Sequence, residues 1–269
     1  MEPSATAVPE VRSGADIRLP FDAYLTPADQ QRTVSLAEQR LARTCMRRFG
    51  LDWPDQSQPP VPTAPINARR YGVIDAAEVA RIGYHPPADP APDPNAVKPA
   101  DPTPEMTMVY GGKGGVSELR GVPIPDGGCL GEARRKLGIG DYSAGSADLN
   151  RIPTDSFALA QRDPRYTAVT AAWSACMRTA GYPYADIWRA NNDPRWSGGT
   201  PSALELATAE ADVACKLSTR LPTVLLTVET EIQTAAIRHN AEALDRARDR
   251  QKATLAQATA VLAQPAAAG

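Results

Sequence analysis

Apolar residues recur at intervals of three or four in both halves of the chain, a spacing that places them on one face of a helix. In the first half this pattern predicts a helix over residues 26–50. Thr26 supplies its cap, Pro27 suits its first turn, and Gly50 supplies its stop. Its apolar face comprises Leu36, Leu41, Cys45 and Phe49.

The second half carries three predicted helices. One covers residues 163–181, and the next begins at Pro201 or Ser202 and is broken at Pro222. The last runs from about residue 223 to 263, and the spacing of its later apolar residues is typical of a coiled coil. At about 1.5 Å per residue this helix would be roughly 60 Å long, so we expect its distal part to project or to dock onto another surface.

Shorter elements fill the middle of the chain. A short helix is predicted around residues 75–82 and another over 129–137, while residues 86–104 are dense in proline and favour an extended polyproline segment. A glycine-rich stretch that can hold a hairpin follows, at residues 111–128. The predicted fold is mainly α, with two disulfide-stapled helical units, a Pro-rich linker and a long C-terminal helix. The expected divisions are a disordered segment at 1–18, a first Cys-Met helical unit at 19–85, a Pro/Gly-rich linker or strap at 86–128, a second helical unit at 129–222, and the C-terminal helix and tail at 223–269.

The four cysteines, Cys45, Cys129, Cys176 and Cys215, lie in predicted helices. None forms a C-x-x-C pair and neither histidine has zinc-finger spacing from them, which disfavours a zinc or thioredoxin-type site. Three disulfide connectivities are open. We favour Cys45–Cys129 with Cys176–Cys215, because each bond then joins a Cys-Met helix to the next cysteine-bearing helix. The alternative is four buried, reduced thiols in a cytosolic protein.

Composition and charge narrow the class of protein. Hydrophobic residues make up 42% of the chain and aromatic residues 6%, which favours a core of small aliphatic side chains between closely packed helices. The net charge is -2 and the basic residues are scattered, so we expect no nucleic-acid partner. No segment reaches roughly 18 apolar residues, so we expect no transmembrane segment. This sequence shows no signal peptide, and that observation taken alone predicts a cytoplasmic protein. The cysteines favour an extracytoplasmic location instead, and we adopt that expectation.

Candidate chemistry is sparse. Residues 111–115, Gly-Gly-Lys-Gly-Gly, have the composition of a phosphate-binding loop but lack its G-x-x-x-x-G-K-[ST] pattern, so we interpret them as a flexible turn. His239 and Glu242 lie three residues apart on the last predicted helix and indicate a solvated face rather than a metal site. No G-x-S-x-G motif is present. The sequence predicts no catalytic residue, no metal and no cofactor.

One segment combines side chains that often anchor protein interfaces. Tyr184, Trp188, Arg189, Arg195 and Trp196 lie in a stretch broken by proline and glycine, which predicts a loop. Because tryptophan and arginine are frequent interface anchors, these five residues are the candidate binding surface. The competing interpretation is that the tryptophans pack onto a small helical core.

The two Cys-Met helices resemble each other, and together with nearby segments they resemble a family of uncharacterised exported proteins of actinobacteria, many of them classed as lipoproteins. The segments that carry this resemblance are 19–24, 45–53, 173–177, 181–182 and 212–216. The resemblance implies an extracytoplasmic location, with genes near those of envelope transporters, and no known activity. The function expected is therefore a non-catalytic binding or interaction module with an envelope protein as partner, and a helix-mediated oligomer is a further option. A secreted cell-wall hydrolase and a cytosolic helical scaffold are the alternatives.

Overall fold

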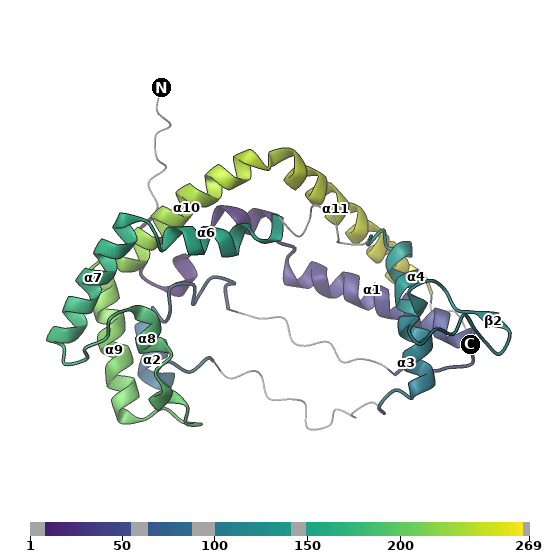
Figure 1. Ribbon diagram of the computed structural model, residues 1–269, viewed down its shortest axis with the longest axis horizontal. Helices are drawn as coiled ribbons and strands as arrows, with labels where there is room; N and C mark the ends of the chain where they lie inside the picture. Colours follow the sequence, from purple (N-terminus) through teal and green to yellow (C-terminus); the bar gives the residue numbers. More distant parts are fainter. Residues whose placement is uncertain (1–8, 55–63, 88–99, 141–148, 266–269) are drawn as a thin grey trace. The chain divides into compact units, whose positions relative to one another are not determined.

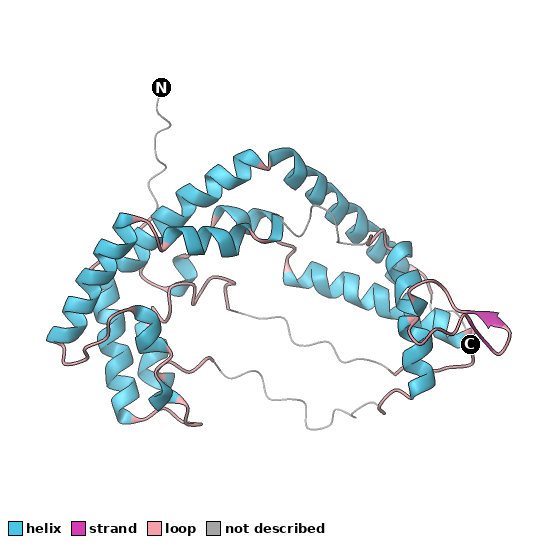
Figure 2. Cartoon of the chain, in the orientation of Figure 1, coloured by secondary structure: helices cyan, strands magenta, loops and turns pink. Residues whose placement is uncertain are grey.

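The computed structural model describes residues 9–54, 64–87, 100–140 and 149–265 of the chain. These residues are mainly helical, as predicted, with one short two-stranded antiparallel sheet among them (Figures 1 and 2). The chain divides into two compact units, and each unit is assembled from three separate stretches of sequence. Unit 1 takes 1–23, 62–89 and 148–241, and unit 2 takes 24–61, 90–147 and 242–269.

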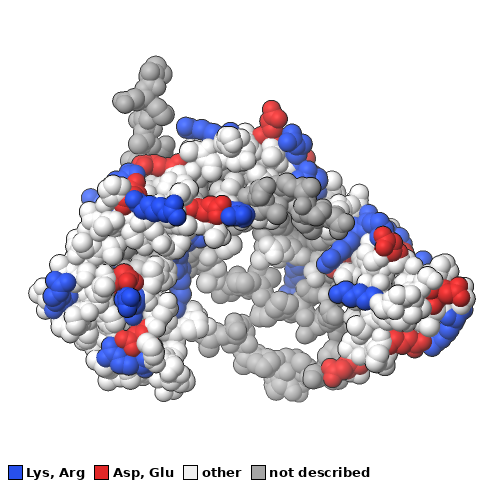
Figure 3. Space-filling view, in the orientation of Figure 1, with Lys and Arg blue, Asp and Glu red and all other residues white. Residues whose placement is uncertain are grey.

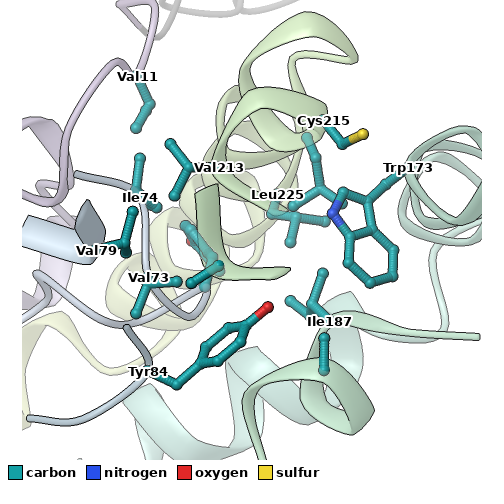
Figure 4. Packing of buried hydrophobic residues seen from close by; sticks show 14 of the residues in the cluster. Val11, Val73, Ile74, Val79, Tyr84, Trp173, Ile187, Val213, Cys215 and Leu225 are labelled. Carbon is teal, nitrogen blue, oxygen red and sulfur yellow. The ribbon is translucent and has the colours of Figure 1, made fainter. Parts of the chain in front are cut away.

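Unit 1 is built from helices around an aromatic and aliphatic core. Its helices are 3-10 turns η1 (Gly14–Asp16), η2 (Pro20–Tyr24) and η3 (Pro194–Trp196), with α2 (Ala76–Ile82), α6 (Ile152–Ala160), α7 (Pro164–Thr179), α8 (Ile187–Asn191), α9 (Ala203–Ser218) and α10 (Leu221–His239). The core places Trp173 among residues from several elements, including Ile74, Ile187 and Val213 (Figure 4). Aliphatic and aromatic side chains of this kind bury the most apolar surface per residue, so they stabilise the unit most.

Several helices of unit 1 begin where the sequence indicates a cap. The side chain of Asp163 accepts the backbone N–H of Arg165 at the start of α7. Ser202 likewise accepts the N–H of Glu205 at the start of α9. Each cap satisfies a donor that the helix itself leaves unpaired, typically worth about 1 kcal/mol.

Unit 2 contains α1 (Ala28–Arg47), α3 (Pro104–Gly111), the hairpin strands β1 (Glu118–Leu119) and β2 (Val122–Pro123), α4 (Gly128–Lys136) and nearly all of α11 (Ala241–Ala263). One of its apolar clusters includes Met46, Phe49 and Trp53, and the Trp53 ring stacks on Tyr110 with ring centroids 4.0 Å apart. A second cluster brings Ala37, Leu137 and Ala258 together from α1, the end of α4 and α11. Two of these three residues are alanines, whose small side chains suit close helix packing.

The structure contains the disulfide pairing favoured from the sequence. Cys45–Cys129 joins α1 to α4 in unit 2, with the two Cα atoms 5.5 Å apart. Cys176–Cys215 joins α7 to α9 in unit 1, with a Cα separation of 5.7 Å. Each unit therefore has one covalent crosslink between two of its helices.

The compact units do not follow the consecutive divisions expected along the chain. The stretch 19–85 is shared between them, because α1 packs on α4 in unit 2 whereas α2 packs on α9 in unit 1. Part of the segment 1–18, predicted to be disordered, is ordered: Val11 and Ile17 are buried in unit 1. Residues 1–8 lie outside the described residues.

Within the described residues, the predicted linker at 86–128 is corrected by α3, which was not expected, whereas the short hairpin expected in 111–128 is present. The stretch 104–123 holds α3 and the β1–β2 hairpin, and α3 packs on α4. Thr103 caps α3 by accepting the N–H of Met106, and Pro104 occupies its first turn. Residues 88–99, which include much of the predicted polyproline segment, lie outside the described residues.

The predicted long C-terminal helix is two helices that meet at Asn240. Its backbone leaves the helical range there, with φ -108° and ψ 17°, and its side-chain amide donates to the carbonyl of Ala236. Asparagine competes with helical hydrogen bonds in this way, which explains the break. The distal helix, α11, buries Leu244 and Ala258, so it docks within unit 2 of its own chain.

A close backbone approach in unit 2 requires glycine and gives a stability prediction. A Cβ on Gly128 would lie 2.4 Å from the nitrogen of Gly112 and 2.5 Å from the carbonyl oxygen of Tyr110, whereas one on Gly115 would meet nothing within 4 Å. Both glycines have positive φ. We therefore expect Gly128→Ala to lower the free energy of unfolding by about 2 to 3 kcal/mol, and the control Gly115→Ala by about 1 kcal/mol. Urea denaturation measures both, and equal losses would contradict the packing argument.

Candidate functional site

The five residues of the predicted binding surface lie between α7 and α9 in unit 1, and the structure corrects their expected loop. Tyr184 follows α7, while Trp188 and Arg189 are in α8 and the other two are in η3. The carboxylate of Asp186 starts α8 by accepting the backbone N–H groups of Trp188 and Arg189, each at 2.9 Å. Asp193 starts η3 by accepting the N–H of Arg195. The aspartates are local cap signals within the segment predicted to be a loop.

Tyr184, Trp188 and Arg189 come together on the wall of an open hollow. Its volume is about 780 Å3, and it is lined by Pro183, Tyr184, Ala185, Trp188, Arg189, Asn192, Asp193 and Pro194. A hollow of this size and composition can accept side chains of a partner, because it offers aromatic surface beside polar groups.

A second hollow also has Trp188 in its lining. It has a volume of about 410 Å3 and is lined by Ile66, Asn67, Arg69, Arg70, Phe157 and Trp188. Ile66 is 75% exposed, an unusual position for a large aliphatic side chain beside aromatic residues. Trp188 is thus shared by two adjoining hollows.

The aromatic side chains around the second hollow hold one another in place. Trp188 packs edge-on against Phe157, with ring centroids 5.9 Å apart. The guanidinium of Arg70 lies over the Phe157 ring, 5.0 Å from its centroid. Edge-to-face and cation–π contacts of this kind favour one arrangement of these side chains around the hollow.

Arg70 forms an ion pair with the buried carboxylate of Glu229 on α10. The Nε of Arg70 donates to Oε2 of Glu229 at 3.2 Å. The Nη2 of Arg70 donates to Oε1 of Glu229 and to the carbonyl of Pro153. The hydroxyls of Tyr71 and Ser156 also donate to this carboxylate, each at 3.0 Å. Burial, followed by the charge of Glu229, raises the pKa of Tyr71, which keeps its hydroxyl protonated and donating. This network fixes the base of the second hollow.

A second polar cluster shapes the wall of the first hollow. The Tyr184 hydroxyl donates to Oδ2 of Asp193 at 2.7 Å, and Arg195 donates to both carboxylate oxygens of Asp193 and to the Tyr184 hydroxyl. Burial, with Asp193 next, raises the pKa of Tyr184 to about 12, while the hydrogen bonds from Arg195 lower the pKa of Asp193. The carboxylate of Asp193 is therefore charged and already occupied by its neighbours.

Trp196 does not belong to the accessible surface. It is buried, its indole N–H donates to the carbonyl of Ala190 at 2.7 Å, and its ring stacks on Tyr84 at 5.8 Å. For Trp196 the competing interpretation of the sequence, packing onto the core, describes the structure, and it holds in part for Trp188, which is partly buried against the same core. Arg195 remains exposed, but its guanidinium is held by Asp193 and lies over the Trp196 ring.

Sequence reasoning missed the residues that come from other parts of the chain. Ile66, Arg69 and Arg70 precede α2, and Phe157 lies on α6, which was not predicted. The only local signal for α6 is its short apolar run with a proline in the first turn. The meeting of these residues with Trp188 depends on tertiary packing.

Paired charges and aromatic side chains set the chemistry of the site. Around the hollows, Arg69, Arg70 and Arg189 form ion pairs with acidic neighbours, as Arg195 does with Asp193. Across the described ranges, no three His, Cys, Asp or Glu side chains converge as metal ligands would. Figure 3 shows basic and acidic residues interspersed on the visible face. What the site offers a ligand is aromatic surface bordered by arginines.

Two wider findings bear on the class of protein. None of the helices in the described part of the chain combines the length and apolarity needed to cross a membrane. Comparison of the chain with protein-family models, with curated proteins and with solved structures finds no match in any of the three.

Proposed function

We propose that this protein is an extracytoplasmic, non-catalytic interaction module of the cell envelope, an accessory to an envelope transporter, and that it contacts a partner protein through the surface around Trp188. The observation that carries the proposal is that Trp188 lines both open hollows and that the exposed Ile66 lines the second with it. Aromatic anchors bordered by arginine are typical of the centres of protein interfaces.

The two disulfides support the extracytoplasmic part of the proposal. Disulfides persist in oxidising compartments and are rare in reducing ones, so they weigh against a cytosolic scaffold. No observation on the described residues favours the alternative of a cell-wall hydrolase. Since α11 packs within unit 2, we place the partner contact at Trp188 rather than on the C-terminal helix.

Site-specific photocrosslinking in the envelope of the native host tests the proposal. We expect benzoylphenylalanine at position 66 to give a discrete crosslinked species with another protein, and to give much less of it when Trp188→Ala is added, because the aromatic anchor is then lost. Position 204 is the matched control, since Leu204 is also a large, exposed aliphatic residue of unit 1 but lies outside both hollows. Equal crosslinking from both positions, or none from position 66, would reject the proposed surface.

A further inference from the structure

In three of the four ion pairs around the two hollows, the arginine side chain is more exposed than its acidic partner. Four arginines pair with acidic residues there: Arg69 with Glu78, Arg70 with Glu229, Arg189 with Asp186 and Arg195 with Asp193. In each pair the arginine side chain is at least as exposed as its acidic partner. The exposed fractions, arginine first, are 29% and 29%, 20% and 0%, 75% and 37%, and 57% and 13%.

This difference in exposure makes the local electrostatic potential at the surface positive, although the formal charges cancel. Four cations and four anions cancel in number, but in three of the pairs the anion is the more buried group, so guanidinium groups are the more accessible charges. Charges deeper in the protein act on an exterior group over a longer distance than the exposed cations do, so the cations dominate at contact. The surface is therefore locally positive.

The lining of the hollows agrees with this. The second hollow is bordered by Arg69 and Arg70 and has no acidic lining residue. In the first, Arg189 lines the wall and Asp193 is the one acidic residue, with both of its carboxylate oxygens bonded to Arg195. Arg189 is the least committed cation, since its Nε lies 3.4 Å from Asp186 and its side chain is mostly exposed.

We propose that the Trp188 surface, defined as Ile66, Arg69, Arg70, Phe157, Trp188 and Arg189, binds an acidic peptide segment of a partner protein. An apolar side chain of that segment occupies the second hollow, against Phe157 and Trp188, and flanking carboxylates lie against Arg69 and Arg189. This assignment rests on the proposed function and gives the partner its chemistry. Arginine suits it because the planar guanidinium can pair with a carboxylate while it remains held by its own neighbours.

A titration of the full-length, 15N-labelled protein with short synthetic peptides tests the assignment. The indole N–H of Trp188 is itself buried, and its signal, identified by its loss in Trp188→Phe, reports on changes in the packing of this ring. We expect acetyl-Glu-Phe-Glu-Glu-amide to shift this signal saturably, and to do so less as salt is added. Acetyl-Lys-Phe-Lys-Lys-amide, of the opposite charge, should leave it in place, and replacement of the peptide's Phe by Ala should weaken binding.

Matched variants separate the charge contribution from the fold. Arg189→Glu should weaken binding of the acidic peptide roughly fivefold, the scale of one exposed ion pair, whereas Arg238→Glu, at the exposed end of α10, should not change it. Ile66→Glu should weaken it as well. Equal binding of both peptides, or no effect of Arg189→Glu, would overturn the assignment. A shift of the Trp188 signal with protein concentration alone would also overturn it, because it would indicate binding of a second copy of the chain. Crosslinking at position 66 with no response to the acidic peptide would retain the contact surface and reject an acidic partner.

Discussion

Lys216→Met is expected to lower the free energy of unfolding of unit 1 by about 3 to 5 kcal/mol, because it leaves a carboxylate buried without its counter-ion. Lys216 and Asp212 lie one turn apart on α9, with no exposed side-chain surface, and Nζ lies 2.8 Å from Oδ2. Nζ also donates to the carbonyl of Val73 at 2.9 Å, and Trp173 donates its indole N–H to Oδ1. The pair therefore links α9 to two other parts of the unit 1 core.

A second variant distinguishes the effect of removing the whole Asp212–Lys216 pair from the effect of removing Lys216 alone. Asp212→Asn added to Lys216→Met removes the orphaned charge, while the amide oxygen can still accept from Trp173. We expect this double variant to be more stable than Lys216→Met alone, since replacing both members of a buried pair costs less than removing one. If the two variants were equally unstable, the loss would come from packing rather than from charge.

The pH dependence of Lys216→Met gives an independent check. Burial raises the pKa of Asp212 even with Lys216 present, and removal of the lysine raises it further. A carboxyl group whose folded pKa exceeds its unfolded pKa binds its proton more tightly in the native state. The contribution of this carboxyl group to the free energy of unfolding is most favourable at low pH and is lost as pH rises through the folded pKa. Chemical denaturation should therefore show a smaller deficit for Lys216→Met at pH 5 than at pH 8.

Local sequence signals predicted most individual helices, because caps and stops act within a few residues. Asp163 and Ser202 accept the backbone N–H groups that a cap must satisfy, and both were placed at helix starts by sequence alone. Asn240 carries a weaker signal, and there the predicted continuous helix is divided. The interruption depends on one amide competing for helical hydrogen bonds, which spacing of apolar residues does not reveal.

The assembly of the units depended on contacts that are distant in sequence. Val11 donates its N–H to Thr223, a contact that orders a segment with little apolar pattern of its own. The Asp212–Lys216 spacing is also ordinary for an exposed helix pair, so nothing local indicates that it is buried. For the candidate site, Trp188 could be predicted as an anchor, but its neighbours Ile66 and Phe157 could not.

The second large effect concerns the disulfides, and it tests whether the two units are stabilised separately. In the chain-entropy model, a crosslink between residues 84 apart, as for Cys45–Cys129, stabilises by about 4 to 5 kcal/mol. For Cys176–Cys215, at a separation of 39, the model gives about 4 kcal/mol. We expect the double variant Cys45→Ala with Cys129→Ala to destabilise unit 2 by about 4 to 5 kcal/mol and to leave the stability of unit 1 nearly unchanged.

Hydrogen exchange followed by mass spectrometry distinguishes the units, because their peptides can be read individually. Exchange should accelerate in α1 and α4 of the Cys45/Cys129 variant and remain slow in α7 and α9, since each unit has its own core. The matched variant, Cys176→Ala with Cys215→Ala, should give the reverse pattern. If either variant accelerated exchange equally in both units, they would form one cooperative structure. Opposite patterns would mean that each disulfide stabilises its own unit, so that loss of unit 2 leaves the Trp188 surface intact in unit 1.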